Sequence, residues 1–261
     1  MLYSGLYEQV INNALNSELA EIPEARKSTA PIDTAEAAKV LAQYLTDVVQ
    51  KGLENVQDNG GGIEAQIQLA NQIVTTIQNT TQEADFAALG VDQRAEQLLA
   101  LFQQNDPRLA TGKSAKDLDR PETSIAQSSL FTGAIHEPQM YTELKKEIVS
   151  ADRIDMLVSF IKWSGLRLIM DELRQFAQSG GELRIITTSY MGATDVKAIE
   201  ELRALPNTKI KVSYDTKRTR LHAKTYVFYR NTGFTTAYVG SSNLSNAAIS
   251  SGLEWNVKVT R

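Results

Sequence analysis

The residues best suited to chemistry lie near the C-terminal end of the sequence. His222 and Lys224 are two positions apart, so in a β-strand their side chains point to the same side. The polar turn Gly240–Asn243 (GSSN) ends nineteen residues after Lys224, and Glu254 follows eleven residues later. A nucleophilic base, a cation, a polar turn and a carboxylate are the groups that a phosphodiester-cleaving site needs.

His222 has two conceivable roles, since a lone histidine is commonly structural. Lys224 on the same strand face favours the functional role, because a lysine seldom points into a core without a partner. A fixed cation nearby also favours the neutral imidazole, which is the nucleophilic form. The other histidine, His136, lies outside any such pattern.

The GSSN turn also allows two compatible roles. Ser242 or Asn243 could cap a helix that begins at Leu244. A helix N-terminus preceded by Gly240 would offer backbone N–H groups to a phosphate. The Ser241 hydroxyl and the Asn243 amide would add donors. We therefore expect Gly240, Ser241 and Ser242 to contact phosphate.

Glu254 belongs to a strand predicted over residues 253–259. Leu253, Trp255 and Val257 alternate with it and share one face, so Glu254 points the other way. It is either a solvated carboxylate or a hydrogen-bond partner that fixes the tautomer of His222, as the third member of a catalytic set.

A basic stretch directly precedes the histidine. The segment 206–230 carries seven basic residues and one acid, in a chain whose net charge is −4. A solvated edge strand accounts for its first two lysines, but less well for the run before His222. Any polyanion must bind to such a local patch, so we expect Lys217, Arg218 and Arg220 to bind nucleic acid.

The composition is that of a globular chain without cysteine. Its 261 residues, 42% of them hydrophobic, suffice for one large domain or two ordinary ones. Disulfides and thiolate metal sites are excluded, and the two histidines lack metal-ligand spacing, so we expect no metal and no cofactor. No apolar run approaches the roughly 20 residues of a membrane span, and no signal peptide is recognisable, so we expect a cytoplasmic location.

Residues 1–105 show helical periodicity, with apolar residues recurring at three- and four-residue spacing. Asp33 and Glu36 resemble a capping box for the second helix. These apolar stripes need a partner, so we expect a small helical bundle that serves as a scaffold or docking module. The predicted helices cover about residues 6–19, 33–53, 63–77 and 92–102.

A linker is predicted over residues 106–124, followed by an α/β domain over residues 125–261. Thr111–Ser114 contains the end of a phosphate-binding loop but lacks its upstream glycine, so it belongs to the linker. Strands and helices then alternate, which predicts a mixed sheet flanked by helices, with a parallel core and a final antiparallel hairpin. The predicted strands cover residues 154–160, 183–188, 209–214, 221–229, 235–239 and 253–259.

The HxK pattern, the glycine-serine-x-asparagine turn and the following glutamate resemble the signature of the phospholipase D superfamily. A single motif in the chain is closest to the nuclease branch of that superfamily. Most of the chain also resembles the N-terminal, phospholipase D-like region of bacterial DEAD/DEAH-box helicase-like proteins. The stretches that carry this second resemblance are Arg120–Thr123, Ser129–Gly133, Ser159–Gly165 and Tyr214–Val259.

The resemblance implies a two-step, metal-free mechanism in which His222 forms a phosphohistidine. It implies catalytic roles for His222, Lys224, Asn243 and Glu254. A second histidine must protonate the leaving oxygen, so a single motif per chain implies a homodimer with a shared active site. Tyr229 departs from the pattern, because an aspartate usually occupies this position, and this departure leaves room for a purely binding site.

These observations predict a helical module followed by a phospholipase D-like nuclease domain that cleaves DNA, or RNA, and is joined to a helicase motor in a longer protein. One alternative is a catalytically silent nucleic-acid-binding module. A further alternative is a phospholipase or phosphatidyltransferase, against which the lack of a membrane segment and of a second motif weighs.

Overall fold

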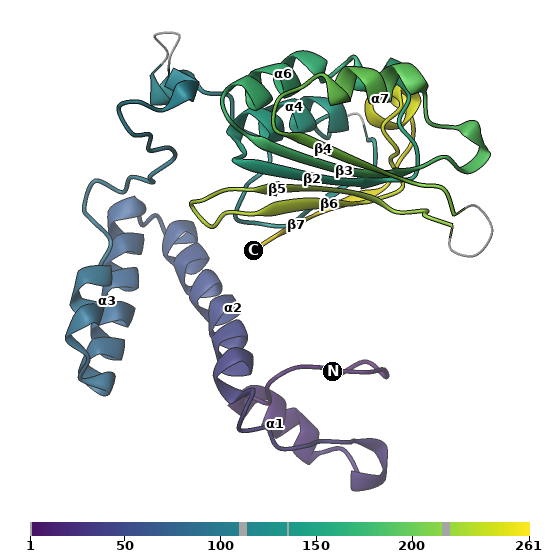
Figure 1. Ribbon diagram of the computed structural model, residues 1–261. Helices are drawn as coiled ribbons and strands as arrows, with labels where there is room; N and C mark the ends of the chain where they lie inside the picture. Colours follow the sequence, from purple (N-terminus) through teal and green to yellow (C-terminus); the bar gives the residue numbers. More distant parts are fainter. Residues whose placement is uncertain (1, 110–113, 135, 216–219) are drawn as a thin grey trace. The chain divides into compact units, whose positions relative to one another are not determined.

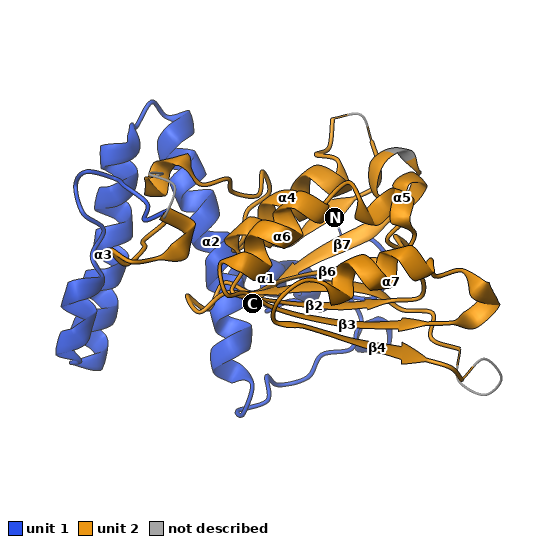
Figure 2. Ribbon diagram, turned by 45° about the horizontal axis from the view of Figure 1, so that its top comes forward, with its two compact units in different colours: residues 1–99 blue, residues 100–261 orange. Residues whose placement is uncertain are grey.

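The computed structural model describes residues 2–109, 114–134, 136–215 and 220–261, with the backbone alone of Ser251. The chain divides into two compact units, Met1–Leu99 and Ala100–Arg261 (Figure 2). None of the described helices has the length and apolar character needed to cross a membrane. The finer boundaries expected at residues 105 and 124 stay a prediction.

The first unit is helical, as predicted, but its helices bury little. Among its described residues, Ile67 is the only buried apolar side chain, so the packed core of a closed bundle is not formed within the unit. The predicted capping box is also wrong, because the Asp33 carboxylate accepts from the N–H of Ala35 at 2.8 Å and the N-cap of α2 is Glu36, which makes no side-chain capping bond. The helices are α1 (Asn13–Ala20), α2 (Ala37–Asp58) and α3 (Ile63–Thr81).

The helix predicted over residues 92–102 is not formed. The Asp92 carboxylate accepts from the backbone N–H of Arg94 at 2.9 Å, and Ala95 adopts a left-handed φ of 54°. A short acidic side chain that bonds its own backbone offers the chain an alternative to a helix. Apolar spacing alone therefore predicted a helix where a local turn forms.

The second unit is built on a mixed sheet, which confirms the predicted fold class. Within the described residues it has seven strands in the order β1-β7-β6-β5-β2-β3-β4. The strands β2, β3 and β4 are parallel, and every other neighbouring pair is antiparallel. The strands are β1 (Ser129–Phe131), β2 (Arg153–Val158), β3 (Glu182–Thr188), β4 (Thr208–Ser213), β5 (Lys224–Tyr229), β6 (Thr236–Gly240) and β7 (Asn256–Thr260).

The helices of this unit cover one face of the sheet. Figure 1 shows α4, α6 and α7 together on that face. Ile154, Met156 and Val158 of β2 point toward them and are buried, as expected for alternating side chains. The helices are α4 (Met140–Ser150), α5 (Trp163–Leu166), α6 (Met170–Gln178) and α7 (Val196–Arg203).

The last strand buries its polar side rather than its apolar one. Trp255 and Val257 lie on one face, as the alternation predicts, but they are 63% and 45% exposed. Asn256 and Lys258 on the opposite face are almost fully buried. A buried lysine requires an anionic partner, and Lys258 Nζ lies 2.9 Å from a carboxylate oxygen of Glu147.

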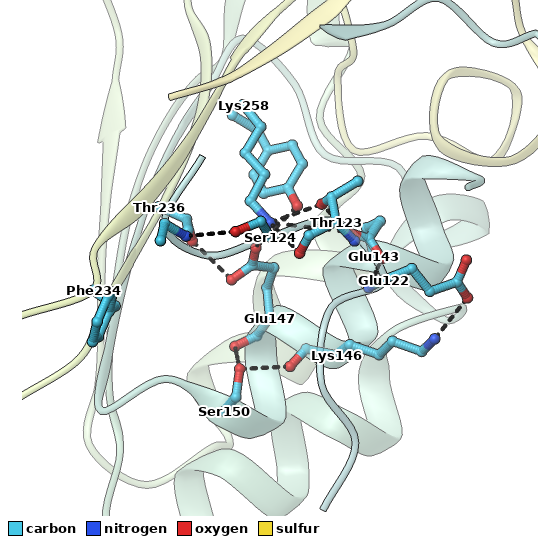
Figure 3. A network of polar contacts seen from close by, with 12 residues as sticks. Glu122, Thr123, Ser124, Glu143, Lys146, Glu147, Ser150, Phe234, Thr236 and Lys258 are labelled. Atoms are coloured by element: carbon cyan, nitrogen blue, oxygen red, sulfur yellow. Dashed lines mark hydrogen bonds and ion pairs between the residues drawn. The ribbon is translucent and has the colours of Figure 1, made fainter. Parts of the chain in front are cut away.

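Glu147 of α4 is the centre of a buried polar network (Figure 3). Burial by itself would raise the pKa of this carboxyl, but the neighbouring Arg230 and Lys258 outweigh it and hold the pKa below its ordinary range. One turn earlier, Glu143 accepts from the Thr123 hydroxyl at 2.5 Å. The network therefore ties the incoming chain, α4 and the sheet together. The donors to Glu147 are Arg230 (2.5 Å), Thr236 (2.8 Å), Tyr238 (3.0 Å) and Lys258 (2.9 Å).

Candidate active site

His222 lies in the segment that leads into the central strand β5. The strand begins at Lys224, three residues later than predicted. The N–H of Ser159 donates to the carbonyl oxygen of Ala223 at 2.9 Å, which holds this segment beside the end of β2. Lys224 Nζ lies 3.0 Å from Nε2 and 3.1 Å from Nδ1 of His222, so the two side chains meet on one side, as expected from the HxK spacing.

Lys224 is the buried member of this pair, and His222 is exposed. Only 8% of Lys224 is exposed, and this burial lowers the pKa of its ammonium, while the charge of Glu254 partly opposes the shift. The ammonium lies almost equally far from both ring nitrogens, so it acts on the imidazole as a charge and selects neither tautomer.

The GSSN turn follows β6, the strand next to β5. A Cβ atom at Gly240 would lie 2.1 Å from the carbonyl oxygen of Trp255, so this close approach requires glycine. Asn243 Oδ1 accepts from the N–H of Phe160 at 3.2 Å, which directs the amide nitrogen away from that residue. Ser159 binds Ala223 of the HxK segment, and the next residue, Phe160, binds Asn243 of the turn. These two neighbouring residues therefore bring the HxK segment and the turn together.

Two expectations for the turn are wrong. No helix begins at Leu244; a five-residue π-helical turn, Ala247–Ser251, follows instead. Ser242 is fully buried, donates to the Ala248 carbonyl at 3.3 Å and accepts from Asn256 Nδ2 at 2.8 Å. Its hydroxyl therefore holds the turn from inside and does not face a phosphate. The physical reason is that Ala248 and Asn256 bind the Ser242 hydroxyl in the interior, and these contacts cannot be recognised from the sequence of the turn.

Ser241 and Asn243 keep their candidate roles as phosphate contacts. Ser241 is exposed, and its Oγ accepts from the N–H of Trp255 at 3.1 Å. Asn243 is 8% exposed, with its amide nitrogen directed away from Phe160. Both side chains lie in the turn beside the HxK segment, where their polar atoms could approach phosphate oxygens.

Glu254 acts on Lys224 rather than on His222. Its charge partly opposes the fall that burial causes in the pKa of Lys224, and it adds to the rise that burial causes in the pKa of Tyr226. No hydrogen bond joins Glu254 to His222 in the described part of the chain, so the expected tautomer-fixing contact is not formed there. Glu254 instead favours the charged form of the lysine, against the larger effect of burial.

Tyr226 and Asn256 are site residues to which sequence reasoning assigned no role. Tyr226 is fully buried in β5, and its hydroxyl donates to the carbonyl oxygen of Ser242 at 3.0 Å. Together with the bond from Asn256 to the Ser242 hydroxyl, this contact supports the turn from two strands. The two-residue alternation places Tyr226 on the face of Lys224, but nothing local identifies its partner on another strand.

The predicted basic residues are only partly described. Arg220 lies over the ring of Tyr190, with 5.2 Å between the guanidinium carbon and the ring centroid. Lys217 and Arg218 lie outside the described residues. His136 is exposed. Within the described ranges, no group of three or more histidine, aspartate or glutamate side chains is placed to hold a metal ion.

Tyr229, the departure from the superfamily pattern, lies at the opposite end of β5. It lies five positions after Lys224, which is about 17 Å along a strand. Its ring packs against the guanidinium of Arg153 at 3.8 Å. Position 229 is therefore remote from His222. Its side chain contributes to packing between β5 and β2.

Comparison with known proteins places the similarity in the second unit. Residues 144–261 match a family model described as the PLD-like domain of cardiolipin synthase. No curated protein matches the chain. Among solved structures, NucT from Helicobacter pylori is 22% identical, with a TM-score of 0.40 over 51% of this chain and 84% of its own. Nuc from Salmonella typhimurium, a phospholipase D family member, is 23% identical, with a TM-score of 0.38 over 52% of this chain and 84% of its own.

Proposed function

Residues 144–261 form a phospholipase D-like domain, and from this premise we propose that the protein is a metal-independent phosphodiesterase, an endonuclease acting on DNA, with His222 as its nucleophile. The observation that carries the proposal is the 3.0 Å approach of the buried Lys224 ammonium to an exposed imidazole. A cation fixed beside a nucleophile can also neutralise the phosphate that the nucleophile attacks.

The proposed reaction has two steps. A nitrogen of His222 forms a bond to phosphorus, and the ester oxygen leaves with the bonding electrons and takes a proton from a second histidine. That second histidine then removes a proton from water, whose oxygen attacks phosphorus and releases His222. Lys224 and the Asn243 amide nitrogen would stabilise the extra negative charge on the five-coordinate phosphorus.

The second histidine is assigned to a second copy of the chain. His136 is exposed and belongs to no HxK pattern, so it is a poor candidate for this role. A two-fold homodimer in which each His222 serves the other would complete the site. The link to a helicase motor and the cytoplasmic location remain predictions on which the site geometry has no bearing.

The test is cleavage of labelled DNA in excess EDTA, with wild type beside His222→Ala. We expect EDTA-resistant cleavage that the substitution abolishes, with a loss of at least about 1,000-fold, because no other group replaces the nucleophile. Wild type should also accumulate an acid-labile covalent adduct with the 5′- or 3′-phosphate. Cleavage that requires Mg²⁺, or that survives in His222→Ala, would refute the mechanism.

A catalytically silent nucleic-acid-binding module is the second candidate. Tyr229 favours it, because the superfamily pattern usually has an aspartate there. Its distance from His222 weakens this argument. Tight DNA binding by wild type without turnover of any phosphodiester substrate would favour the silent module. Turnover of phospholipid vesicles, rather than DNA, would favour a phospholipase or phosphatidyltransferase.

A further inference from the structure

One half of the sheet places its strand ends beside His222. The carboxyl ends of β2, β3 and β4 lie at the same edge as the start of β5, because β2 to β4 are parallel and β5 is antiparallel to β2. Figure 2 shows the arrowheads of β3 and β4 pointing to this edge. The N–H of Ser189 donates to the Ser213 carbonyl at 3.0 Å and joins the last two ends.

Aromatic and cationic side chains follow these strand ends. Tyr190, the second residue after β3, has the guanidinium of Arg220 over its ring at 5.2 Å. Tyr214, directly after β4, is 78% exposed. Lys197, of α7, lies over the ring of Trp163 at 4.4 Å. We name Tyr190, Tyr214 and Arg220 the aromatic track.

The other half of the sheet edge has a different character. From Asn231 to Val257 the sequence contains no lysine or arginine, and the exposed large side chains there include Leu253 and Trp255. A polyanionic strand that reaches His222 is therefore attracted toward β3 and β4 and not toward β6 and β7. Three strand spacings separate β5 from β4, so the track extends about 14 Å from the reacting residue.

We propose that the aromatic track binds unpaired nucleotides next to the scissile phosphate, so that single-stranded nucleic acid is the substrate of this site. A base offers its face to a protein ring only when it is unstacked, and such stacking is largely independent of sequence. Arg220 would contact the phosphate that follows, since a guanidinium suits both rings and phosphates. The choice of substrate rests on the proposed function, whereas binding by the track can be measured without cleavage.

The experiment measures fluorescence anisotropy with the full chain carrying His222→Ala, so that no probe is cut. The probes are a labelled 15-nucleotide DNA strand and the same strand in a duplex. Tyr190→Ala and Tyr214→Ala should each weaken binding of the single strand roughly 5- to 100-fold, the usual range for a stacked base. Phe234→Ala is the matched control, because this ring is 45% exposed in the loop at the far end of β5 and should not affect binding.

Tyr190→Phe and Tyr214→Phe keep the rings and should restore binding, which separates stacking from a general loss of fold. Equal affinity for single strand and duplex would overturn the proposal, as would tyrosine variants that match Phe234→Ala or a protein that binds anionic phospholipid vesicles instead of DNA. Tyrosine-dependent binding without wild-type cleavage would support the track and refute the nuclease. Tyr190→Ala and Tyr214→Ala are therefore also made with His222 intact, and unchanged cleavage of single-stranded DNA by these variants would support the nuclease and refute the track.

Discussion

At the scale of single residues, the exposed His222 lies 3.0 Å from the ammonium of a lysine that is itself buried. Lys224 is 8% exposed, and its pKa is lowered because its charge has lost water, although Glu254 restores part of the preference for the charged form. A lysine in that position gains most when an anion arrives beside it. The pair is therefore poised to bind phosphate next to the nucleophile, which is the residue-scale basis of the proposed function.

Tyr226→Phe tests whether the turn must be held for catalysis. The substitution removes only the hydroxyl that donates to the Ser242 carbonyl at 3.0 Å, and the loss of a buried hydrogen bond costs about 1–3 kcal/mol. We expect kcat to fall about 10-fold with KM within a factor of two, because Asn243 in the turn acts in the transition state. Steady-state kinetics on a short DNA oligonucleotide measure both constants.

Tyr229→Phe is the matched control for this prediction. It removes a hydroxyl from the same strand, at the end remote from His222. Its kcat should equal that of wild type. Equal kcat values in the two variants would mean that the Tyr226 hydroxyl does not position the turn.

At the scale of elements, α4 is attached to the sheet by charge as much as by apolar packing. Leu144 and Ile148 are fully buried on this helix, and so are Glu143 and Glu147. The two carboxylates bind the incoming chain at Thr123 and the strands at Lys258. Breaking a buried pair by removing one partner leaves an uncompensated charge, which is the costly case.

Glu147→Gln should therefore lower the free energy of unfolding by about 3–5 kcal/mol at pH 7, because Arg230 and Lys258 lose their anion. The pKa of Glu147 is lower in the folded protein than its ordinary value of 4.5. Its stabilising contribution is thus complete above about pH 4.5 and is lost as the pH falls through the folded-state pKa. Urea unfolding from pH 3 to pH 7 measures both effects.

In Glu147→Gln the decline in stability below pH 4.5 should be smaller than in wild type. Glu201→Gln is a suitable control, since Glu201 forms a partly exposed pair with Arg174 at 3.3 Å and should change stability by less than about 1 kcal/mol. An unchanged pH dependence in Glu147→Gln would show that the network does not hold an ionised carboxylate.

At the scale of the whole molecule, the proposed chemistry needs more than one chain. Each chain supplies one HxK pattern, and the reaction uses two histidines. The first unit does not supply the second histidine, since its described residues contain none. The catalytic unit of this proposal is therefore a dimer.

Subunit mixing distinguishes a shared site from independent sites. When wild type and His222→Ala are mixed in equal amounts and allowed to exchange subunits, only dimers with two wild-type chains should be active. We expect about one quarter of the wild-type activity, because random pairing makes activity proportional to the square of the wild-type fraction. Cleavage assays with native mass spectrometry of the mixture give activity and composition together.

Mixing wild type with the active variant Tyr229→Phe in the same proportion should leave the activity unchanged. A linear dependence on the wild-type fraction would contradict the shared site. Full activity from a protein that is monomeric at micromolar concentration would contradict it as well.

The sequence by itself determined the features that depend on local periodicity. Two-residue spacing predicted that His222 and Lys224 share a side, and alternating strands and helices predicted a mixed sheet with helices. The GSSN turn was also recognisable from its glycine and polar residues, although the contact that requires Gly240, with Trp255, is seen only in the structure. Such features need only the chain's own neighbours along the sequence.

Only the tertiary structure decided which side chains face the site. Ser242 points inward because its hydrogen-bond partners are Asn256 and Ala248. The strand β7 buries its polar side because Lys258 forms an ion pair there with Glu147 of α4. These placements depend on residues that are distant in sequence and adjacent across strands and helices. Periodicity gives the face of a residue within its own element, but the partner that covers that face comes from the packing of the whole domain.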